Sequence, residues 1–281
     1  MLLPKCGRFY NTFMIFLNKP EKNMTEMALV TGASGGIGLE LARIHAEKGG
    51  NLVLVARSQD KLNALAAELR NRYGVQVTVL AEDLSAHGAA QRIFAATEAA
   101  GIQVDVLMNN AGFGGHGRFF ERRLADEQNM IQVNIAALTE LTHFYLQGMV
   151  ARRKGRVLNV SSTASFMPGP LQAVYYASKA YVTSFSQAIA EEVAEYGITV
   201  TALCPGAVAT GFVAAGGLED VAAWNNAKSA RSVAEYGYAA MQRGELVAFN
   251  EAKLGFTANW IVPFMPRKTM LKLSRKAMEK S

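Results

Sequence analysis

The chain has 281 residues, enough for one large α/β domain or two small ones, and half of its residues are hydrophobic. Its formal net charge is +6, and residues 252–281, with seven Lys or Arg and one Glu, carry the whole excess. The preceding part of the chain therefore gives no indication of nucleic-acid binding. Two cysteines, Cys6 and Cys204, exclude a disulfide framework and favour a cytoplasmic location. Four histidines without metal-ligand spacing predict no metal site.

The first 26 residues stand apart from the rest. Their apolar run, 9–17, contains Asn11 and Thr12 and is too short to span a bilayer. No small-residue cleavage site follows the run, so a signal peptide is a poor fit. We expect residues 1–26 to be a disordered extension, or to precede a true start at Met24 or Met27.

Seven apolar runs then alternate with helical segments, and no linker rich in Pro, Gly or Ser separates them. The runs lie at about 27–31, 51–56, 75–81, 105–109, 155–161, 198–204 and 244–249. This alternation predicts one α/β domain over residues 27–250. We expect a doubly wound fold, with about seven parallel strands and helices on both faces of the sheet.

A glycine-rich turn joins the first run to a helix. The segment 31–38 reads Thr-Gly-Ala-Ser-Gly-Gly-Ile-Gly. Gly32 permits the tight turn, Gly36 lets a pyrophosphate approach the backbone, and Gly38 lets the helix pack on the strand. The N–H groups at the helix start face the phosphates. The pattern predicts a Rossmann-type dinucleotide site that includes Ser34 and Ile37.

A Tyr-x-x-x-Lys pair supplies the candidate chemistry. A free phenol has a pKa near ~10, too high for ready proton exchange at neutral pH. Lys179 lies one helical turn after Tyr175, so its charge is expected to lower the pKa of that phenol. Ser162 ends an apolar strand and can meet the helix from the neighbouring sheet. Tyr176 and Ser161 are the alternatives, but no lysine stands four residues after Tyr176.

In their order along the chain, these motifs resemble the short-chain dehydrogenase/reductases, from about Met27 to Asn250. Asp83-Leu84, Asn109-Asn110-Ala111-Gly112, Asn134 and Pro205-Gly206 extend the match. The resemblance implies that Asn134, Ser162, Tyr175 and Lys179 are catalytic, and its spacing selects Ser162 over Ser161. It also implies a cofactor site formed by Gly32, Ser34, Gly36, Ile37, Gly38, Arg57, Ser58, Asp83, Leu84, Asn110, Ala111, Gly112, Tyr175, Lys179, Pro205, Gly206, Val208 and Thr210.

The end of the second strand indicates which nicotinamide cofactor binds. An NAD-selective site needs a carboxylate there for the ribose 2′-hydroxyl, and such a carboxylate repels a 2′-phosphate. This chain has Arg57 and Ser58 just past the strand and no acid at its end. A guanidinium matches a phosphate in geometry and charge, so NADP(H) is predicted. Many NADP-binding relatives also carry a basic residue in the glycine loop, where this chain has Gly35.

The resemblance implies a carbonyl reductase in which Tyr175 protonates the oxygen that Ser162 polarises. The implied roles are binding of the nicotinamide ribose for Lys179 and positioning of a water for Asn134. Apolar side chains are expected to line the substrate pocket, so an apolar ketone or aldehyde is predicted. They lie at 113–116, 166–168 and 212–224. Two alternatives remain open. One is a 3-oxoacyl reductase acting on carrier-bound chains, in which the basic turn 152–154 would contact an acidic carrier protein. The other is a non-catalytic dinucleotide sensor.

Residues 251–281 form a basic, amphipathic tail. Either it makes a weak peripheral contact with a membrane, or it forms a helix that packs on the body or on a second subunit. The resemblance also implies a homo-oligomer, dimeric or tetrameric.

Overall fold

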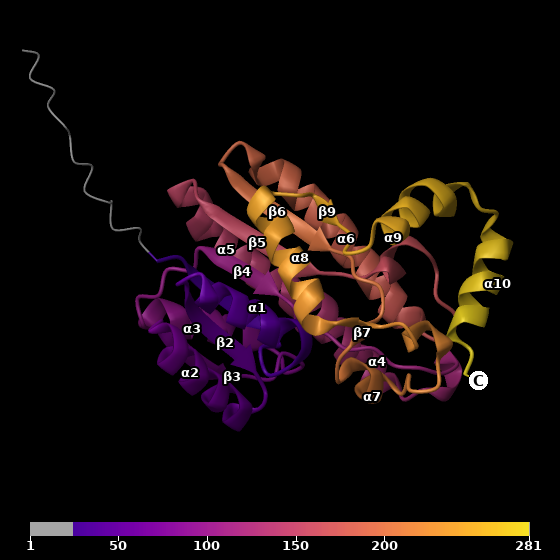
Figure 1. Ribbon diagram of the computed structural model, residues 1–281, viewed down its shortest axis with the longest axis horizontal. Helices are drawn as coiled ribbons and strands as arrows, with labels where there is room; N and C mark the ends of the chain where they lie inside the picture. The colour runs from indigo at the N-terminus through magenta and orange to yellow at the C-terminus, as the bar shows by residue number, and fades with distance from the viewer. Residues whose placement is uncertain (1–24, 281) are drawn as a thin grey trace, which may run out of the picture.

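A seven-stranded parallel sheet organises residues 25–280, which are the residues that the structure, a computed structural model, describes (Figure 1). The strand order is β3-β2-β1-β4-β5-β6-β9. The strands are β1 (Met27–Thr31), β2 (Asn51–Ala56), β3 (Val77–Ala81), β4 (Val106–Asn109), β5 (Gly155–Val160), β6 (Ile198–Leu203) and β9 (Val247–Ala248). From β1 the chain adds β2 and β3 on one side of β1. It then crosses to β4, which lies on the other side of β1, and continues outward to β5, β6 and β9.

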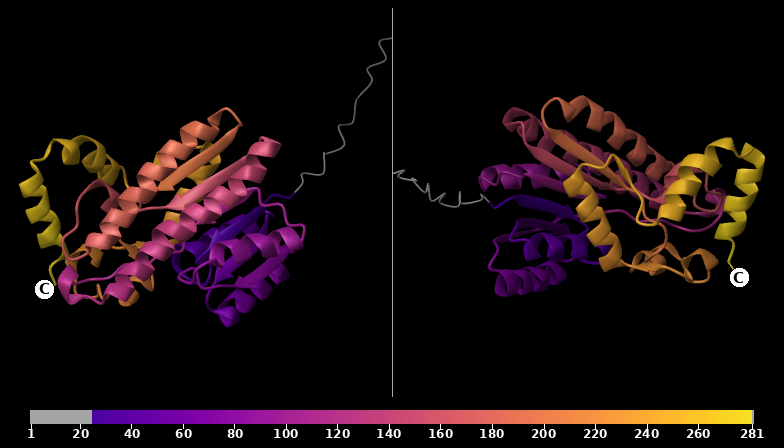
Figure 2. Two further views of the ribbon diagram at one scale, coloured as in Figure 1. Left: turned by 180° about the vertical axis from the view of Figure 1, so that it is seen from behind. Right: turned by 45° about the horizontal axis from the view of Figure 1, so that its top comes forward.

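Helices cover both faces of the sheet because its strand residues are apolar on both sides (Figures 1 and 2). Ala28 and Val30 of β1 belong to a buried cluster with α1 (Gly36–Glu47), α2 (Gln59–Tyr73) and α8 (Ala230–Arg243). Leu29, between them, belongs to a second cluster with α3 (Ala89–Ala99), α5 (Leu138–Arg152) and α6 (Ala173–Ala194). Alternate residues of β1 therefore pack into the hydrophobic cores on opposite faces of the sheet.

The predicted doubly wound α/β fold is confirmed, with small changes at the strand ends. β3 and β4 begin later than expected, and β5 and β6 each end one residue earlier. The expected last strand, 244–249, contains only two paired residues. Gly244 ends α8 in a left-handed conformation, with φ of 69°, and so cannot begin the strand.

One predicted boundary moves. Of the expected extension, 1–26, residues 1–24 lie outside the described residues, whereas the Glu26 carboxylate pairs with Arg156 at 2.9 Å and so belongs to the folded body. The chain after β9 is helical. It forms α9 (Ala252–Phe256), a π-helical turn (Thr257–Ile261), a 3-10 turn (Val262–Phe264) and α10 (Arg267–Met278). We call residues 252–280 the terminal arch, because the segment curves round one end of the molecule (Figures 1 and 2).

None of the helices between residues 25 and 280 combines the length and the apolar character needed to cross a bilayer.

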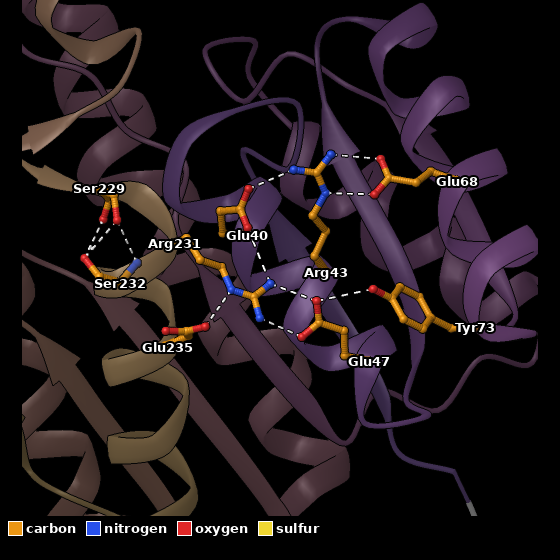
Figure 3. Close-up of polar contacts among 9 residues, drawn as sticks. All are labelled: Glu40, Arg43, Glu47, Glu68, Tyr73, Ser229, Arg231, Ser232 and Glu235. Atoms are coloured by element: carbon orange, nitrogen blue, oxygen red, sulfur yellow. Dashed lines mark hydrogen bonds and ion pairs between the residues drawn. The ribbon is translucent and has the colours of Figure 1, made fainter.

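A charged cluster ties three helices together on one face of the sheet (Figure 3). Arg231 of α8 contacts Glu47 of α1 at 2.7 Å and Glu235 of its own helix at 2.7 Å. Arg43 of α1 contacts Glu68 of α2 at 2.8 Å. The bond to Arg231 is the main reason that the pKa of Glu47 lies below its usual value. These contacts hold α1, which begins at the glycine-rich turn, between its two neighbours.

Replacing Arg231 with alanine should lower the free energy of unfolding by about 1 kcal/mol at neutral pH, because solvent screens each pair of this exposed network. The folded-state pKa of Glu47 is depressed, so this contribution is present above the unfolded value of ~4.3 and is lost as the pH falls through the folded value. Urea denaturation at neutral and acidic pH measures it. Arg243→Ala is the control, since the one ion pair of Arg243 within residues 25–280 is with nearby Glu245, and its loss should cost less. Equal losses in both variants, or a loss independent of pH, would contradict this account.

Candidate active site

A cleft of about 1020 Å³ lies at the carboxyl ends of the strands and brings most of the predicted residues together. Its lining includes Gly32, Ser34, Gly36, Ile37, Arg57, Ser58, Asp83, Leu84, Asn110, Ala111, Gly112, Ser162, Tyr175, Lys179, Pro205, Gly206, Val208 and Thr210. Gly38 and Asn134 lie behind this lining. A smaller cavity of about 200 Å³ lies at the amino ends of the strands, near Glu26 and Arg156, and contains none of the predicted site residues.

The glycine-rich turn has the conformation and the close contacts that glycine permits. Gly32 and Gly36 have φ of +66° and +56°, in the left-handed region. A Cβ on Gly36 would meet the Thr210 side chain at 3.1 Å. A Cβ on Gly38 would lie 2.3 Å from Asn110 Nδ2 and 2.5 Å from the Gly32 carbonyl. Backbone N–H groups at the start of α1 thus border the cleft without side chains in the way, which fits a pyrophosphate.

Thr31 fixes this turn to the neighbouring loop, although it was not among the predicted site residues. Its hydroxyl accepts the backbone N–H groups of Asn110 and Ala111, both at 3.0 Å. Asn110 Nδ2 donates to the Thr31 carbonyl at 2.9 Å. The sequence signal was a hydroxyl residue at the end of a buried strand, but only the pairing of β1 with β4 shows what the hydroxyl contacts.

Tyr175 stands near the start of α6, with its ring centroid 5.3 Å from that of Phe212. Burial raises the pKa of Tyr175 to about 12, and the neighbouring Ser162 hydroxyl only partly opposes the rise. The expectation that Lys179 lowers this pKa is therefore wrong for the protein without cofactor. The phenol is fully protonated at neutral pH.

Lys179 is buried and directs its ammonium group to the sheet. Its Nζ donates to the Val160 carbonyl at 2.8 Å and lies 5.8 Å from the centroid of the Tyr175 ring. Burial lowers the pKa of Lys179 to about 8. The lysine is thus held near the phenol by a backbone acceptor, at a position where burial disfavours its charged form.

The alternatives to Ser162 and Tyr175 have structural partners. Both serines border the cleft, but Ser161 is buried and its hydroxyl donates to the Lys179 carbonyl at 3.0 Å. Tyr176 borders the cleft but packs tightly on Gly169, where a Cβ would approach its ring to 2.2 Å. The hydroxyl of Ser162 also caps the short 3-10 helix Thr163–Phe166 by accepting the N–H of Ala164 at 3.1 Å.

Asn134 lies in a π-helical turn, Gln132–Ala137, between α4 (Leu124–Ile131) and α5. Its Oδ1 accepts the N–H of Phe113 at 3.1 Å, and its Nδ2 donates to the Phe113 carbonyl at 3.0 Å. A Cβ on Gly112 would lie 3.0 Å from Asn134 Oδ1 and 3.5 Å from Lys179 Nζ. Asn134 therefore supports the wall of the cleft beside Lys179, at a helical irregularity of the kind that often marks functional sites.

Two cations border the outer end of the cleft, Arg57 and Lys61. Sequence reasoning found Arg57 but missed Lys61, which stands four residues later on α2. Burial opposes ionisation of Asp83, but two hydrogen bonds from Ser85 and the charge of Arg57 keep the pKa of Asp83 below its usual value. Gly35 is exposed, with open space where a side chain would stand.

The inner end of the cleft is largely apolar and partly differs from the prediction. Phe113, Phe212 and Trp224 line it as expected. The segment 166–168 does not, because Phe166 packs on Phe249 and the Pro168 carbonyl accepts the Ser274 hydroxyl of the terminal arch. The arch itself adds Leu254 and Met278 to the lining, which sequence reasoning missed. Among residues 25–280, no three His, Cys, Asp or Glu side chains are grouped to hold a metal ion.

The sequence model described as "short chain dehydrogenase" matches residues 26–218, more than half of the chain. The chain belongs to the short-chain dehydrogenase family. Its members are oxidoreductases that use a nicotinamide dinucleotide, and residues 26–218 include the glycine-rich turn and the Tyr-x-x-x-Lys pair.

Similar proteins include mammalian enzymes and a bacterial structure. The chain is 36% identical over 189 residues to the very-long-chain 3-oxoacyl-CoA reductase of Mus musculus, covering 66% of this chain and 60% of that protein. It is 34% identical to the 17-beta-hydroxysteroid dehydrogenase type 3 of Mus musculus, covering 74% and 70%. A short-chain dehydrogenase from Sphingobium yanoikuyae, solved in complex with NADPH, superimposes with a TM-score of 0.76 at 30% identity, covering 83% and 95%. The chain thus spans about 60% of the length of the first of these relatives.

Placing an alanine at Gly38 should lower the free energy of unfolding by about 1–3 kcal/mol, because the added methyl overlaps Asn110 and the Gly32 backbone. Gly35→Ala is the matched control, because its φ of −178° is extended and no atom lies within 4 Å of the new Cβ. Its stability should stay within about 0.5 kcal/mol of the parent. Denaturant unfolding without cofactor measures both. If the two variants unfold alike, α1 does not pack on Asn110 as closely as described.

Proposed function

We propose that this protein is an NADPH-dependent reductase whose substrates are ketones or aldehydes with a large apolar part. The observation that carries the proposal is the placement of Tyr175, Ser162 and Lys179 in one cleft with the glycine-rich turn. With a pKa of about 12 the Tyr175 phenol carries its proton at neutral pH, which is the form that reduction of a carbonyl needs, although burial also makes it a weaker acid than a free phenol.

The cofactor fits the cleft by its chemistry. The backbone at Gly36 and Ile37 would hold the pyrophosphate, Asp83 and Leu84 the adenine, and Lys179 the nicotinamide ribose. NADPH supplies a hydride to the carbonyl carbon. Among the residues of this chain, Ser162 would donate a hydrogen bond to the carbonyl oxygen, and that bond strengthens as negative charge develops there.

Tyr175 would then transfer its proton to the oxygen and become a phenolate for a moment. The Lys179 ammonium stabilises that anion, and its pKa of about 8 lets it return a proton to the phenol near neutral pH. Asn134, bonded to the backbone of Phe113, would keep the wall beside Lys179 in place.

Selectivity for NADPH over NADH rests on the outer end of the cleft. Arg57 and Lys61 would pair with the 2′-phosphate, and β2 ends without the carboxylate that binds a free ribose hydroxyl. Glu82 borders the same part of the cleft, but its carboxylate is paired with Arg92 at 3.0 Å.

An apolar substrate is supported by the lining from Phe113, Phe212, Trp224 and Met278, where an unpaired polar group would be costly to bury. Two of the relatives are named for a very-long-chain 3-oxoacyl-CoA and for a 17-beta-hydroxysteroid, and both compounds have large apolar parts. Gln172 also lines the cleft, and it is buried with its amide nitrogen unpaired in the described part of the chain. It would suit a second oxygen on the substrate.

A 3-oxoacyl thioester has such a second oxygen, so reduction of 3-oxoacyl chains is the second candidate. The basic turn 152–154 does not support a carrier protein at the cleft. It precedes β5, and Lys154 lies at the amino ends of the strands beside the smaller cavity, opposite the site. Arg152 donates to the Val104 carbonyl at 2.9 Å, and Arg153 stacks over Tyr196.

Replacing Tyr175 with phenylalanine should reduce kcat by about 10²–10⁴-fold, since the proton donor is lost, while NADPH affinity changes little. Steady-state rates with 3-oxoacyl-CoA and steroid ketones, together with NADPH titration by fluorescence, separate the two effects. Tyr176→Phe is the control and should keep its activity within about tenfold. Unchanged turnover in Tyr175→Phe would refute the mechanism. If neither the parent nor any variant reduces a carbonyl but NADPH still binds, the sensor alternative is favoured.

Removing either cation, by Arg57→Ala or Lys61→Ala, should weaken NADPH binding by about 10–100-fold and leave NADH binding nearly unchanged, because only the 2′-phosphate loses a charged partner. Thermal stabilisation across titrations of the two cofactors reports the preference without a known substrate. Arg72→Ala, at the far end of α2, should leave both titrations as they are in the parent. Equal stabilisation of the parent protein by NADH and NADPH would overturn the assignment.

A further inference from the structure

The first half of the terminal arch presents a row of aromatic side chains to solvent. Residues 252–264 form one continuous helical stretch, and Phe256, Trp260 and Phe264 recur in it at every fourth position. All three side chains point largely to solvent, being 60%, 66% and 79% exposed. Gly255 and Ala258 are buried on the other side. A surface helix of a soluble protein ordinarily has the opposite arrangement.

The second half of the arch is basic on its outer side. α10 buries Met270, Ser274 and Met278, which lie at successive turns of one face. The exposed face carries Lys268, Lys272, Arg275 and Lys276. Arg275 pairs with Glu279 at 3.2 Å. Within residues 25–280, the three lysines have no carboxylate at ion-pair distance. Their charges are therefore available to a partner outside the chain.

The inner side of the arch is part of the cleft wall. Leu254 and Met278, near its two ends, line the cleft. His116 Nε2 lies 2.7 Å from the Met278 carbonyl, the Ser274 hydroxyl donates to the Pro168 carbonyl at 2.8 Å, and Val221 forms a β-bridge with Lys280. These contacts hold the second half of the arch to the body, and the ribbon of the whole segment lies along one end of the molecule (Figure 2).

We propose that the outer side of the terminal arch docks on the surface of an anionic lipid bilayer. Trp and Phe side chains at a helix surface insert at the boundary between headgroups and acyl chains, and lysines beside them are attracted to anionic headgroups. A second copy of the chain fits this surface less well. Two arches face to face would bring together two segments that each carry the net charge of +6, and would remove those charges from water.

Sedimentation with vesicles tests the docking. The parent protein should bind vesicles of phosphatidylcholine mixed with phosphatidylglycerol much more tightly than vesicles of phosphatidylcholine alone, and high salt should weaken the binding. Trp260→Ser with Phe264→Ser should reduce the partition coefficient at least about tenfold, as should Lys272→Glu with Lys276→Glu. Leu246→Ser is the control for lost apolar surface, since Leu246 is exposed but lies outside the arch. Arg72→Glu with Arg123→Glu matches the change in net charge elsewhere on the body.

Tryptophan emission provides a readout at the residue itself. The chain has two tryptophans, Trp224 and Trp260, so in Trp224→Phe the emission comes from Trp260 alone. Its maximum should shift to shorter wavelength when anionic vesicles are added, and circular dichroism verifies that each variant is folded. Absence of binding by the parent, or binding that the arch variants retain, overturns the proposal. A dimer in size-exclusion chromatography that Trp260→Ser with Phe264→Ser dissociates would also overturn it, in favour of a second copy as the occupant.

Discussion

The joint between the ends of β1 and β4 is the constraint on which the site depends. The strand order reverses there, so the loops that follow the two strands diverge and leave a crevice between them. Thr31 and Asn110 close the base of that crevice with hydrogen bonds between the strands. Gly38 lets α1 pack directly on Asn110. The glycine-rich turn and the opposite wall of the cleft are therefore fixed to each other through a few polar contacts.

Burial sets the acid–base properties of this cleft more than the proximity of Tyr175 and Lys179 does. Removing both groups from water disfavours their charged forms, so the pKa of the phenol rises to about 12 while that of the ammonium falls to about 8. The same environment thus keeps the tyrosine protonated and makes the lysine ready to give up a proton. The Val160 carbonyl fixes the position of the lysine in this environment.

The terminal arch has an apolar inner side and a positively charged outer side. Its inner side contributes Leu254 and Met278 to the apolar end of the cleft, and its outer side carries the positive charge of the whole chain. An exposed row of aromatic side chains has no partner in the described residues, and hydrogen bonds from His116 and Ser274 keep the segment in place. The same short segment consequently lines the substrate end of the cleft with its inner side and exposes the aromatic row on its outer side.

The sequence by itself determined the fold class, the glycine-rich turn and the order of the motifs. Apolar periodicity and motif spacing are local properties, so they can be read directly from the linear sequence. The predicted oligomer and the cytoplasmic location stay predictions. Tertiary structure decided the rest. It brought in Thr31, Lys61 and Met278, whose roles depend on neighbours distant in sequence or on the orientation of a helix. It also reversed the expected shift of the Tyr175 pKa, because desolvation depends on everything that surrounds a group and not on the one residue four positions away.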